Sequence, residues 1–237
     1  MAYSNSKLVS YKKLSPNYND RKGKAIKKIT IHHMAGNLSV ETCGNIFADK
    51  NREASSNYGI GTDGRIALYV EEKNRSWCSS SSSNDYQAVT IEVANCSGAP
   101  DWKVSDKALA ALIDLCTDIC KRNGIKELNF TGDASGNLTQ HNYFAATDCP
   151  GKYLKSKFSY IAKEVNKRLK AFEAYKVKVT ASSLKVRDGA GTKYKVNTYI
   201  KKGEVYTITA EKEANGVKWG KLKSGAGWVS LRYTKKI

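Results

Sequence analysis

Ile29-Thr30-Ile31-His32-His33 is the stretch of sequence that decides the fold. Its β-branched residues predict a buried strand, and Ala35-Gly36-Asn37 breaks the pattern directly afterwards. Neighbouring side chains of a strand point to opposite faces, so His32 and His33 cannot easily bind the same metal ion. One of them is therefore a candidate ligand and the other packs or forms a hydrogen bond. The spacing alone does not say which.

The chain has 3 histidines, and the third, His141, lies upstream of Cys149-Pro150-Gly151. Two imidazoles and a thiolate are a sufficient protein ligand set for a catalytic zinc ion, with a fourth position left for water. Cys149 has a competing interpretation as a nucleophile paired with His141. A soft thiolate beside imidazoles also suits zinc. The combination favours a zinc site that supports hydrolysis.

A charged residue, Glu92, interrupts the strand-like run Val89-Thr90-Ile91-Glu92-Val93-Ala94. Such a residue lies either on a solvated face or where function needs it, and the residues alone leave these alternatives equal. A carboxylate near zinc-activated water can accept a proton and pass it to a leaving amine. Glu92 is therefore the candidate acid/base residue.

Helical patterns alternate with these strands. The stretch from Ser105 to Arg122 has apolar residues at helical spacing, with Ser105 as N-cap and Asn123-Gly124 as the stop signal. Ser39 predicts the N-cap of a helix through Phe47, and a further helix runs from about Tyr153 to Lys170. Asp63-Gly64 predicts a hairpin. The alternation predicts an α/β domain over residues 1–172.

Two segments of this domain carry weaker signals. Residues 1–28 are polar and basic and predict an N-terminal arm with little regular structure. The run from Ser79 to Ser83 predicts a flexible segment, with a plain linker favoured over a mobile loop near a cleft.

Residues 173–237 change in character. Short strand-like runs such as Val177-Lys178-Val179 and Val205-Tyr206-Thr207-Ile208 alternate with glycines, which predicts a small all-β barrel. This part is also the more basic one: it holds 15 Lys+Arg against 4 Asp+Glu after residue 175, compared with 25 against 18 before it. The charge suits a targeting role.

Composition limits the function classes. The chain has 237 residues and a formal net charge of +18, which predicts affinity for polyanions, either nucleic acid or an anionic wall polymer. No apolar run approaches the roughly 18 residues that a membrane span needs, so no membrane insertion is expected. Met1 to Asn5 lacks the order of a secretory signal. The 6 cysteines are irregularly spaced, which argues against a disulfide framework.

These motifs together resemble the zinc-dependent N-acetylmuramoyl-L-alanine amidases, a family that includes phage endolysins and peptidoglycan recognition proteins. The resemblance covers roughly residues 25–170. It rests on the strand ending in His32-His33, on Asn57-Tyr58-Gly59-Ile60 with Asp63-Gly64, on the strand around Glu92, and on His141 with Thr147-Asp148-Cys149-Pro150-Gly151. It implies a central mixed sheet flanked by helices.

The resemblance also implies roles for single residues. It implies His32, His141 and Cys149 as the ligands of Zn2+, and Glu92 as the acid/base carboxylate. Thr147, two residues before the cysteine, matches a position where relatives hold Lys or Thr near the substrate carbonyl. Some relatives carry a catalytic tyrosine at the position of Ser56, and Tyr58 lies close to it but out of register. Tyr58 is therefore a further catalytic candidate.

Residues 176–237 resemble a bacterial SH3 domain, on the segments Thr180 to Thr192 and Gly225-Ala226-Gly227-Trp228-Val229. Such domains usually bind wall peptide or polymer, although a barrel without wall affinity is the alternative. The expected function is cleavage of the bond between N-acetylmuramic acid and L-alanine in peptidoglycan. The expected setting is a phage endolysin made in the bacterial cytoplasm that acts on the wall after release. The alternatives are a bacterial autolysin, a non-catalytic recognition protein or, from charge alone and without a matching motif, a nucleic-acid-binding protein.

Overall fold

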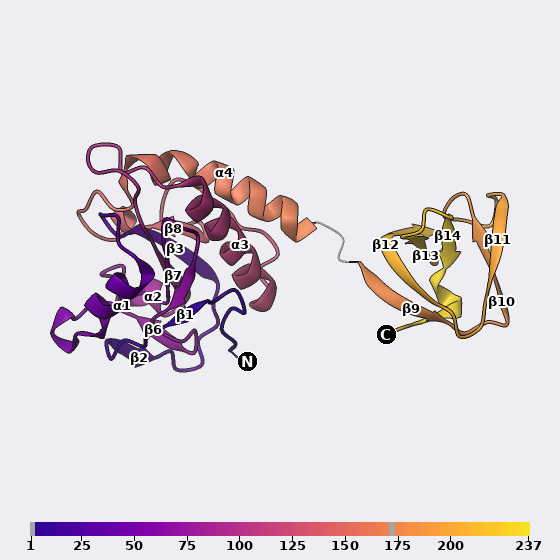
Figure 1. Ribbon diagram of the computed structural model, residues 1–237, viewed down its shortest axis with the longest axis horizontal. Coiled ribbons are helices and arrows are strands. Elements are labelled where there is room, and N and C mark those ends of the chain that lie inside the picture. Colours follow the sequence, from indigo (N-terminus) through magenta and orange to yellow (C-terminus); the bar gives the residue numbers. More distant parts are fainter. Residues whose placement is uncertain (1–2, 171–173) are drawn as a thin grey trace. The chain divides into compact units, whose positions relative to one another are not determined.

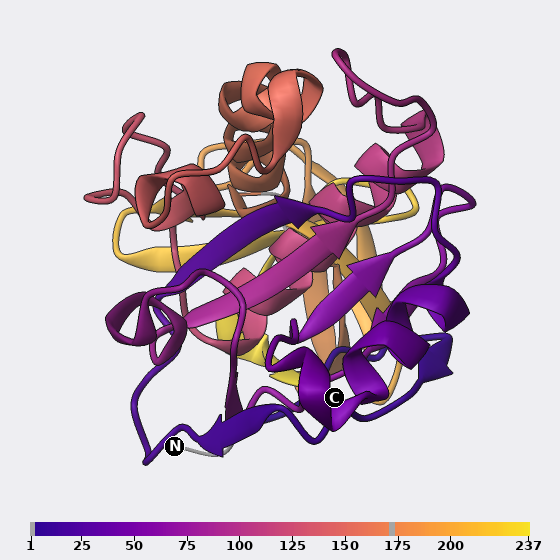
Figure 2. The ribbon, with the colours of Figure 1, turned by 90° about the vertical axis from the view of Figure 1, so that its left-hand side faces the viewer.

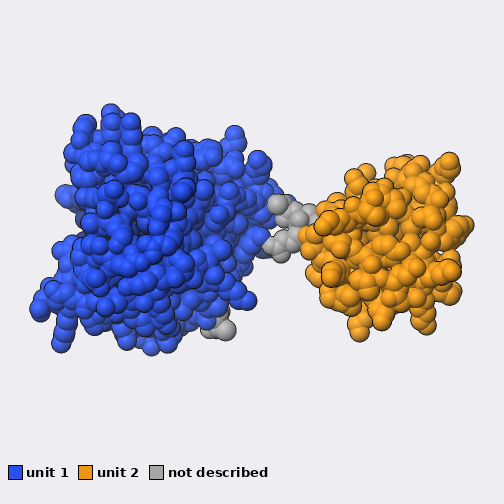
Figure 3. All heavy atoms as spheres, viewed as in Figure 1, with its two compact units in different colours: residues 1–170 blue, residues 171–237 orange. Residues whose placement is uncertain are grey.

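The computed structural model describes residues 3–170 and 174–237, which belong to two compact units, residues 1–170 and 171–237 (Figure 3). The boundary predicted between residues 172 and 173 lies outside the described residues. Each unit has its own hydrophobic core, so each is described by itself.

A six-stranded mixed sheet forms the centre of the first unit (Figure 1). The strand β3 runs parallel to both β7 and β8, and β4 runs parallel to β7 but antiparallel to β5. The expected mixed sheet is thus confirmed. In spatial order the strands are β1 (Tyr11–Lys12), β5 (Ile66–Leu68), β4 (Tyr58–Ile60), β7 (Ala88–Val93), β3 (Lys28–His33) and β8 (Leu138–Gln140).

Alternation along the central strands gives the sheet two different faces. Ile29 and Ile31 of β3 belong to a core that also includes residues of the helices α3 (Asp106–Arg122) and α4 (Gly151–Lys170). The helix α1 (Val40–Ala48) packs through Val40, Cys43 and Phe47 in a separate cluster with Tyr69. Helices therefore lie on both sides of the sheet (Figure 2).

The predicted helix boundaries have a clear physical origin. The hydroxyl of Ser39 accepts a hydrogen bond from the Thr42 amide, and that of Ser105 accepts one from the Ala108 amide. Each serine thus satisfies an amide at the start of a helix that has no partner within the helix. Gly124 follows α3 with φ +69°, a backbone conformation that glycine adopts without strain. The expected helices are confirmed, with α4 starting at Gly151.

The N-terminal segment is more ordered than predicted. It contributes β1 to the main sheet and β2 (Tyr18–Asp20), which pairs antiparallel with β6 (Asn74–Ser76). Arg21 follows β2 in the chain and is fully buried. Its guanidinium donates hydrogen bonds to the backbone carbonyls of Glu72, Asn74, Asp85, Tyr86 and Ala88. The expectation of an arm with little regular structure is wrong, because this one side chain fixes the segment to three others.

The second unit is all-β, as predicted. Its strands form one antiparallel sheet around a core that includes Val179, Val186, Ile208 and Val229. This arrangement is consistent with an SH3-like domain. In spatial order the strands are β11 (Val196–Lys201), β10 (Ser183–Arg187), β14 (Trp228–Ser230), β13 (Val217–Leu222), β12 (Val205–Ala214), β9 (Tyr175–Val179) and β15 (Thr234–Lys236). Among the described residues, no helix is both long and apolar enough to cross a bilayer.

Candidate functional site

The parallel strands bring the candidate ligands to one edge of the sheet. His32 and His33 end β3, and Glu92 lies beside His32 in the register with β7. His141 begins the short helix η2 (His141–Tyr143) directly after β8, which runs parallel to β3. Cys149 comes just before α4. Since the carboxyl ends of parallel strands meet at the same edge, residues far apart in sequence converge there.

Three candidate ligand atoms lie close together. One ligand atom from each of His32, His141 and Cys149 lies within 4.8 Å of the others. The distance from Cys149 Sγ to His32 Nδ1 is 3.7 Å. Ligand atoms of a tetrahedral zinc ion are about 3.6 Å apart when the Zn–N and Zn–S distances are about 2.1 and about 2.3 Å. The spacing of this sulfur and nitrogen therefore suits a zinc ion.

The imidazoles are in the form that binds metal. Burial lowers the pKa of His32 well below its ordinary value, with a smaller effect of His141, and burial also lowers the pKa of His141. Both rings are thus neutral at pH 7, as metal binding requires. Nε2 of His32 and Nε2 of His141 are buried without a hydrogen-bond partner among the described residues. Buried polar atoms seldom lack a partner, so the protein alone does not satisfy every nitrogen of these two rings, and Nδ1 of His32 is the nitrogen that faces the Cys149 sulfur.

His33 plays a different part from its neighbour. Its backbone N–H donates to Cys149 Sγ at 3.4 Å. Its ring packs edge-on against Trp102, with 5.3 Å between the ring centroids. The alternation of the strand therefore separates the two histidines: His32 joins the cluster, while His33 packs and orients the thiol.

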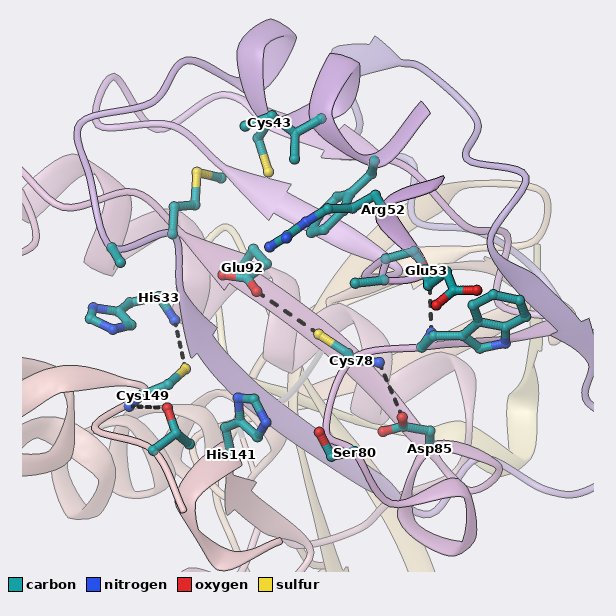
Figure 4. Close-up of a pocket in the computed structure, with 18 of the residues that line it drawn as sticks. His33, Cys43, Arg52, Glu53, Cys78, Ser80, Asp85, Glu92, His141 and Cys149 are labelled. Atoms are coloured by element: carbon teal, nitrogen blue, oxygen red, sulfur yellow. Dashed lines mark hydrogen bonds between the residues drawn. The ribbon is translucent and has the colours of Figure 1, made fainter. Parts of the chain in front are cut away.

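Glu92 occupies a position suited to a proton acceptor. Its Oε2 atom is buried without a partner in the described structure, and its Oε1 lies 3.9 Å from Cys78 Sγ. Burial raises the pKa of Glu92 to about 8, an effect that Arg52 partly offsets. Figure 4 shows Arg52 extending toward Glu92 from the opposite side of the cleft. A carboxyl whose pKa lies near neutrality can both accept and donate a proton.

A cleft of about 710 Å³ opens over this edge of the sheet (Figure 4). Glu92, His141, Thr147 and Cys149 line it. His32 is only 1% exposed and contributes its ring from within. The Thr147 hydroxyl accepts a hydrogen bond from the Cys149 amide at 3.2 Å. Four of the sequence-predicted residues thus share one cavity with room for a substrate.

Tyr58 lies elsewhere. In the register of β4 with β7 it pairs with Ile91, so its side chain shares the apolar face, opposite the one that carries Glu92. The side chain is fully buried, and its hydroxyl donates to Glu72 at 2.6 Å and accepts from the Ser6 amide. Tyr58 does not line the cleft. Tyr58 therefore has a packing position outside the cleft in this structure.

Several residues of the cleft were not predicted as site residues from the sequence. Cys78 groups with His32 and Glu92, with one ligand atom of each within 4.8 Å of the others. The serine run is not a plain linker: the Ser81 hydroxyl caps the short helix α2 (Ser82–Asp85), and Asp85 accepts hydrogen bonds from Ser79. Ser80, Ser81 and Ser82 line the cleft. A capping serine followed by Asn84 and Asp85 was the available signal for this ordered turn.

Comparison with known proteins identifies the fold. A family model described as N-acetylmuramoyl-L-alanine amidase matches residues 22–152, which is more than half of the chain. No curated protein matches the sequence. Among solved structures, a selenomethionine derivative of AmpD is similar at 17% identity and a TM-score of 0.54, covering 68% of this chain and 99% of that one.

Two further structures share the fold. The N-acetylmuramoyl-L-alanine amidase LysC from Clostridium intestinale has 19% identity and a TM-score of 0.51, covering 67% of this chain and 95% of its own. The Staphylococcus aureus hydrolase AmiA, solved in complex with its ligand, has 15% identity and a TM-score of 0.52, covering 70% of this chain and 91% of its own. At such identities the likeness concerns the fold alone.

Proposed function

The chain belongs to the N-acetylmuramoyl-L-alanine amidase family, and we propose that it cleaves the amide between N-acetylmuramic acid and L-alanine with a zinc ion held by His32, His141 and Cys149. The observation that carries this proposal is the convergence of three ligand atoms within 4.8 Å, with Glu92 next to His32. Four residues from four separate segments converge at this cleft: Glu92, His141 and Cys149 line it, and His32 lies buried behind its wall. A purely structural role does not account for the buried atoms of His32, His141 and Glu92 that lack a partner among the described residues.

The residues present fit zinc. Two neutral imidazoles and one thiol match a catalytic zinc site, which keeps a further position open. When bound, the ion supplies Lewis acidity that polarises a carbonyl and lowers the pKa of water. Burial raises the pKa of the Cys149 thiol, and the His33 amide, which donates to the sulfur, partly offsets this effect and helps to fix the side chain.

Glu92 and Thr147 carry the rest of the chemistry. Glu92 takes a proton from the attacking water as the C–O bond forms at the lactyl carbonyl carbon. It returns that proton to the alanine nitrogen as the C–N bond breaks, so the carboxyl ends in its starting state. The Thr147 hydroxyl lines the cleft and can donate a hydrogen bond to the carbonyl oxygen as negative charge develops there.

The second unit serves attachment to the wall in this proposal. Its charge, 15 Lys+Arg against 4 Asp+Glu after residue 175, suits an anionic polymer. A hydrolase joined to a basic β unit suits an endolysin, which must stay on the wall while it cuts. A bacterial autolysin has the same needs. The ligand set argues against a recognition protein without catalysis.

A product analysis tests the cleavage site. Purified peptidoglycan is digested with the zinc-loaded chain, and new amino groups are identified. We expect free L-alanine amino termini. Release of reducing sugars without new amino termini would contradict the assignment. Lysis that continues unchanged after chelation, with zinc absent by metal analysis, would contradict the metal's part in it.

A variant separates proton transfer from metal binding. Glu92→Gln should keep stoichiometric zinc but lose about 10²-fold or more of the turnover, the usual contribution of a general base. Glu127→Gln, an exposed carboxylate outside the cleft, is the matched control and should be fully active. Full turnover by the Glu92 variant would remove Glu92 from the mechanism while leaving the zinc site intact.

A further inference from the structure

A second cavity, of about 420 Å³, lies in the second unit and is independent of the cleft. This volume falls at the lower end of the range for small-ligand sites. Trp219 on β13 lines it, together with Arg187 on β10 and Arg232 in the short helix η3 (Leu231–Tyr233). The cavity is therefore formed where three separate segments of the sheet and its connections meet.

The indole of Trp219 lacks a partner. The residue is 4% exposed, and its Nε1 is buried without a hydrogen bond among the described residues. A buried indole N–H normally has an acceptor, and leaving a donor unsatisfied costs about 1–3 kcal/mol. An unpaired donor that lines a cavity is a place where a ligand can supply the acceptor.

Cations surround the same cavity. Lys185, Arg187 and Arg232 line it, and none of its lining residues is Asp or Glu. One amino group of the Arg187 guanidinium donates to the Tyr194 carbonyl at 2.7 Å, which holds the side chain while leaving its other donors available. A site with three cations and no carboxylate selects an anionic acceptor group. Guanidinium groups pair with carboxylates through two parallel hydrogen bonds.

The rest of the lining decides between kinds of anion. Leu184, Val217 and Tyr233 add apolar surface to the wall of the cavity. A phosphodiester chain presents charge along its whole length and gains little from apolar walls. The carboxylate at the end of a peptide with small side chains offers one charged group next to methyl groups. The charged group matches the cations of the lining, and the methyl groups match its apolar residues.

We infer that this cavity binds the free C-terminal carboxylate of a short peptide, with the Trp219 indole N–H and the guanidinium groups of Arg187 and Arg232 as donors. The inference deepens the wall-attachment part of the proposed function, on which it rests for its partner. It gives the second unit a defined contact with the peptide part of the wall, in addition to its general attraction for polyanions.

An NMR titration of the 237-residue chain tests the site. The chain has 4 tryptophans, so its ¹⁵N-labelled form gives a small set of indole N–H signals, and Trp219→Phe identifies the Trp219 signal. The probes are acetyl-D-alanyl-D-alanine, its C-terminal amide and glycerophosphoglycerol. We expect the free acid alone to shift the Trp219 signal in a saturable way. An equal response to the amide, or a response to the phosphodiester alone, would overturn the assignment.

Charge variants keep the test independent of the tryptophan. Arg232 is exposed, so Arg232→Ala should fold normally and weaken peptide binding about tenfold or more, as expected for loss of a charge-assisted hydrogen bond. Lys202→Ala removes another exposed cation, in the turn between β11 and β12, and should leave the affinity unchanged. Equal affinity of the Arg232 variant and the wild type would refute the site.

Sedimentation with purified wall separates this inference from the proposed function. Glu92→Gln, which should bind wall without digesting it, is mixed with wall and centrifuged. If the chain pellets but the peptide titration is flat, the cavity assignment fails and wall attachment stands. If the chain stays in solution, wall attachment itself fails.

Discussion

Replacing Glu92 by glutamine should remove a pH dependence from the stability of the metal-free chain. Burial raises the pKa of Glu92 from an ordinary value of 4.5 to about 8. Between these values the folded chain keeps a proton on Glu92 that the unfolded chain has released. The stabilisation from the protonated carboxyl is therefore fully present below pH 4.5 and is lost as the pH rises through about 8.

The size of the effect follows from this shift. One proton gives a slope of about 1.4 kcal/mol per pH unit, which amounts to about 3 kcal/mol between roughly pH 5 and 7.5. Glu92 is partly exposed and lines an open cleft, so solvent screening reduces the expected loss to about 2 kcal/mol. Glutamine has the same shape and does not titrate. The lowered pKa values of His32 and His141 change the pH dependence of stability equally in the wild type and the variant, so their contribution cancels when the two are compared.

Urea unfolding of the chelator-treated chain measures this difference. Wild type, Glu92→Gln and the exposed control Glu127→Gln are unfolded at several pH values between about 5 and 7.5, and their free energies of unfolding are compared. We expect the control to follow the wild type, and the Glu92 variant to gain stability relative to both as the pH rises. Parallel curves for all three proteins would show that the Glu92 carboxyl is not in a low-dielectric site, and the argument for its altered pKa would fail.

Three other substitutions test the site and the fold. Cys149→Ala should abolish stoichiometric zinc binding and wall lysis, and metal analysis that still finds one zinc per chain would reject the thiol as a ligand. Tyr58→Phe should leave lysis unchanged but lower the free energy of unfolding by about 1–2 kcal/mol, because a buried hydrogen bond to Glu72 is lost. A large loss of lysis with normal stability would instead indicate that Tyr58 takes part in catalysis. Arg21→Met should lower the free energy of unfolding, measured in urea, by about 3–5 kcal/mol, because five backbone carbonyls lose their donor. A decrease below about 1 kcal/mol would contradict the role of Arg21 in fixing the N-terminal segment.

The sequence predicted those parts of the fold that local chemistry determines. Ser39 and Ser105 cap their helices because a hydroxyl at that position satisfies a free amide, and this depends on a few adjacent residues only. The strand at Ile29–His33 was recognisable from its β-branched residues. The mixed sheet and the choice of His32 over His33 as the expected ligand came from resemblance to a family, since no local pattern shows which strands become neighbours.

The parts that sequence reasoning missed depend on partners distant in the chain. Arg21 is an ordinary basic residue in a polar stretch, and only the carbonyls of residues 72–88 make it a buried structural element. Tyr58 became a candidate because it lies two residues from Ser56, the position of a catalytic tyrosine in some relatives, whereas the strand alternation turns it to the opposite face from Glu92. Cys78 carries no recognisable motif and reaches the cleft because β6 is held beside β2.

The polar face of the sheet carries buried groups of two kinds, some with hydrogen-bond partners and some without. Thr30 on β3 bonds to the Thr139 hydroxyl at 2.9 Å, and Thr90 on β7 bonds to the Ser76 hydroxyl at 2.7 Å, so these buried hydroxyls are satisfied. Two residues further along the same strands and on the same face stand His32 and Glu92, which keep a buried nitrogen and a buried oxygen without partners in the described structure. These unpaired groups do not stabilise the fold, because each buried donor or acceptor without a partner costs about 1–3 kcal/mol. The cost is explained if bound groups complete the network, and this is the physical argument that supports the site proposed at this edge of the sheet.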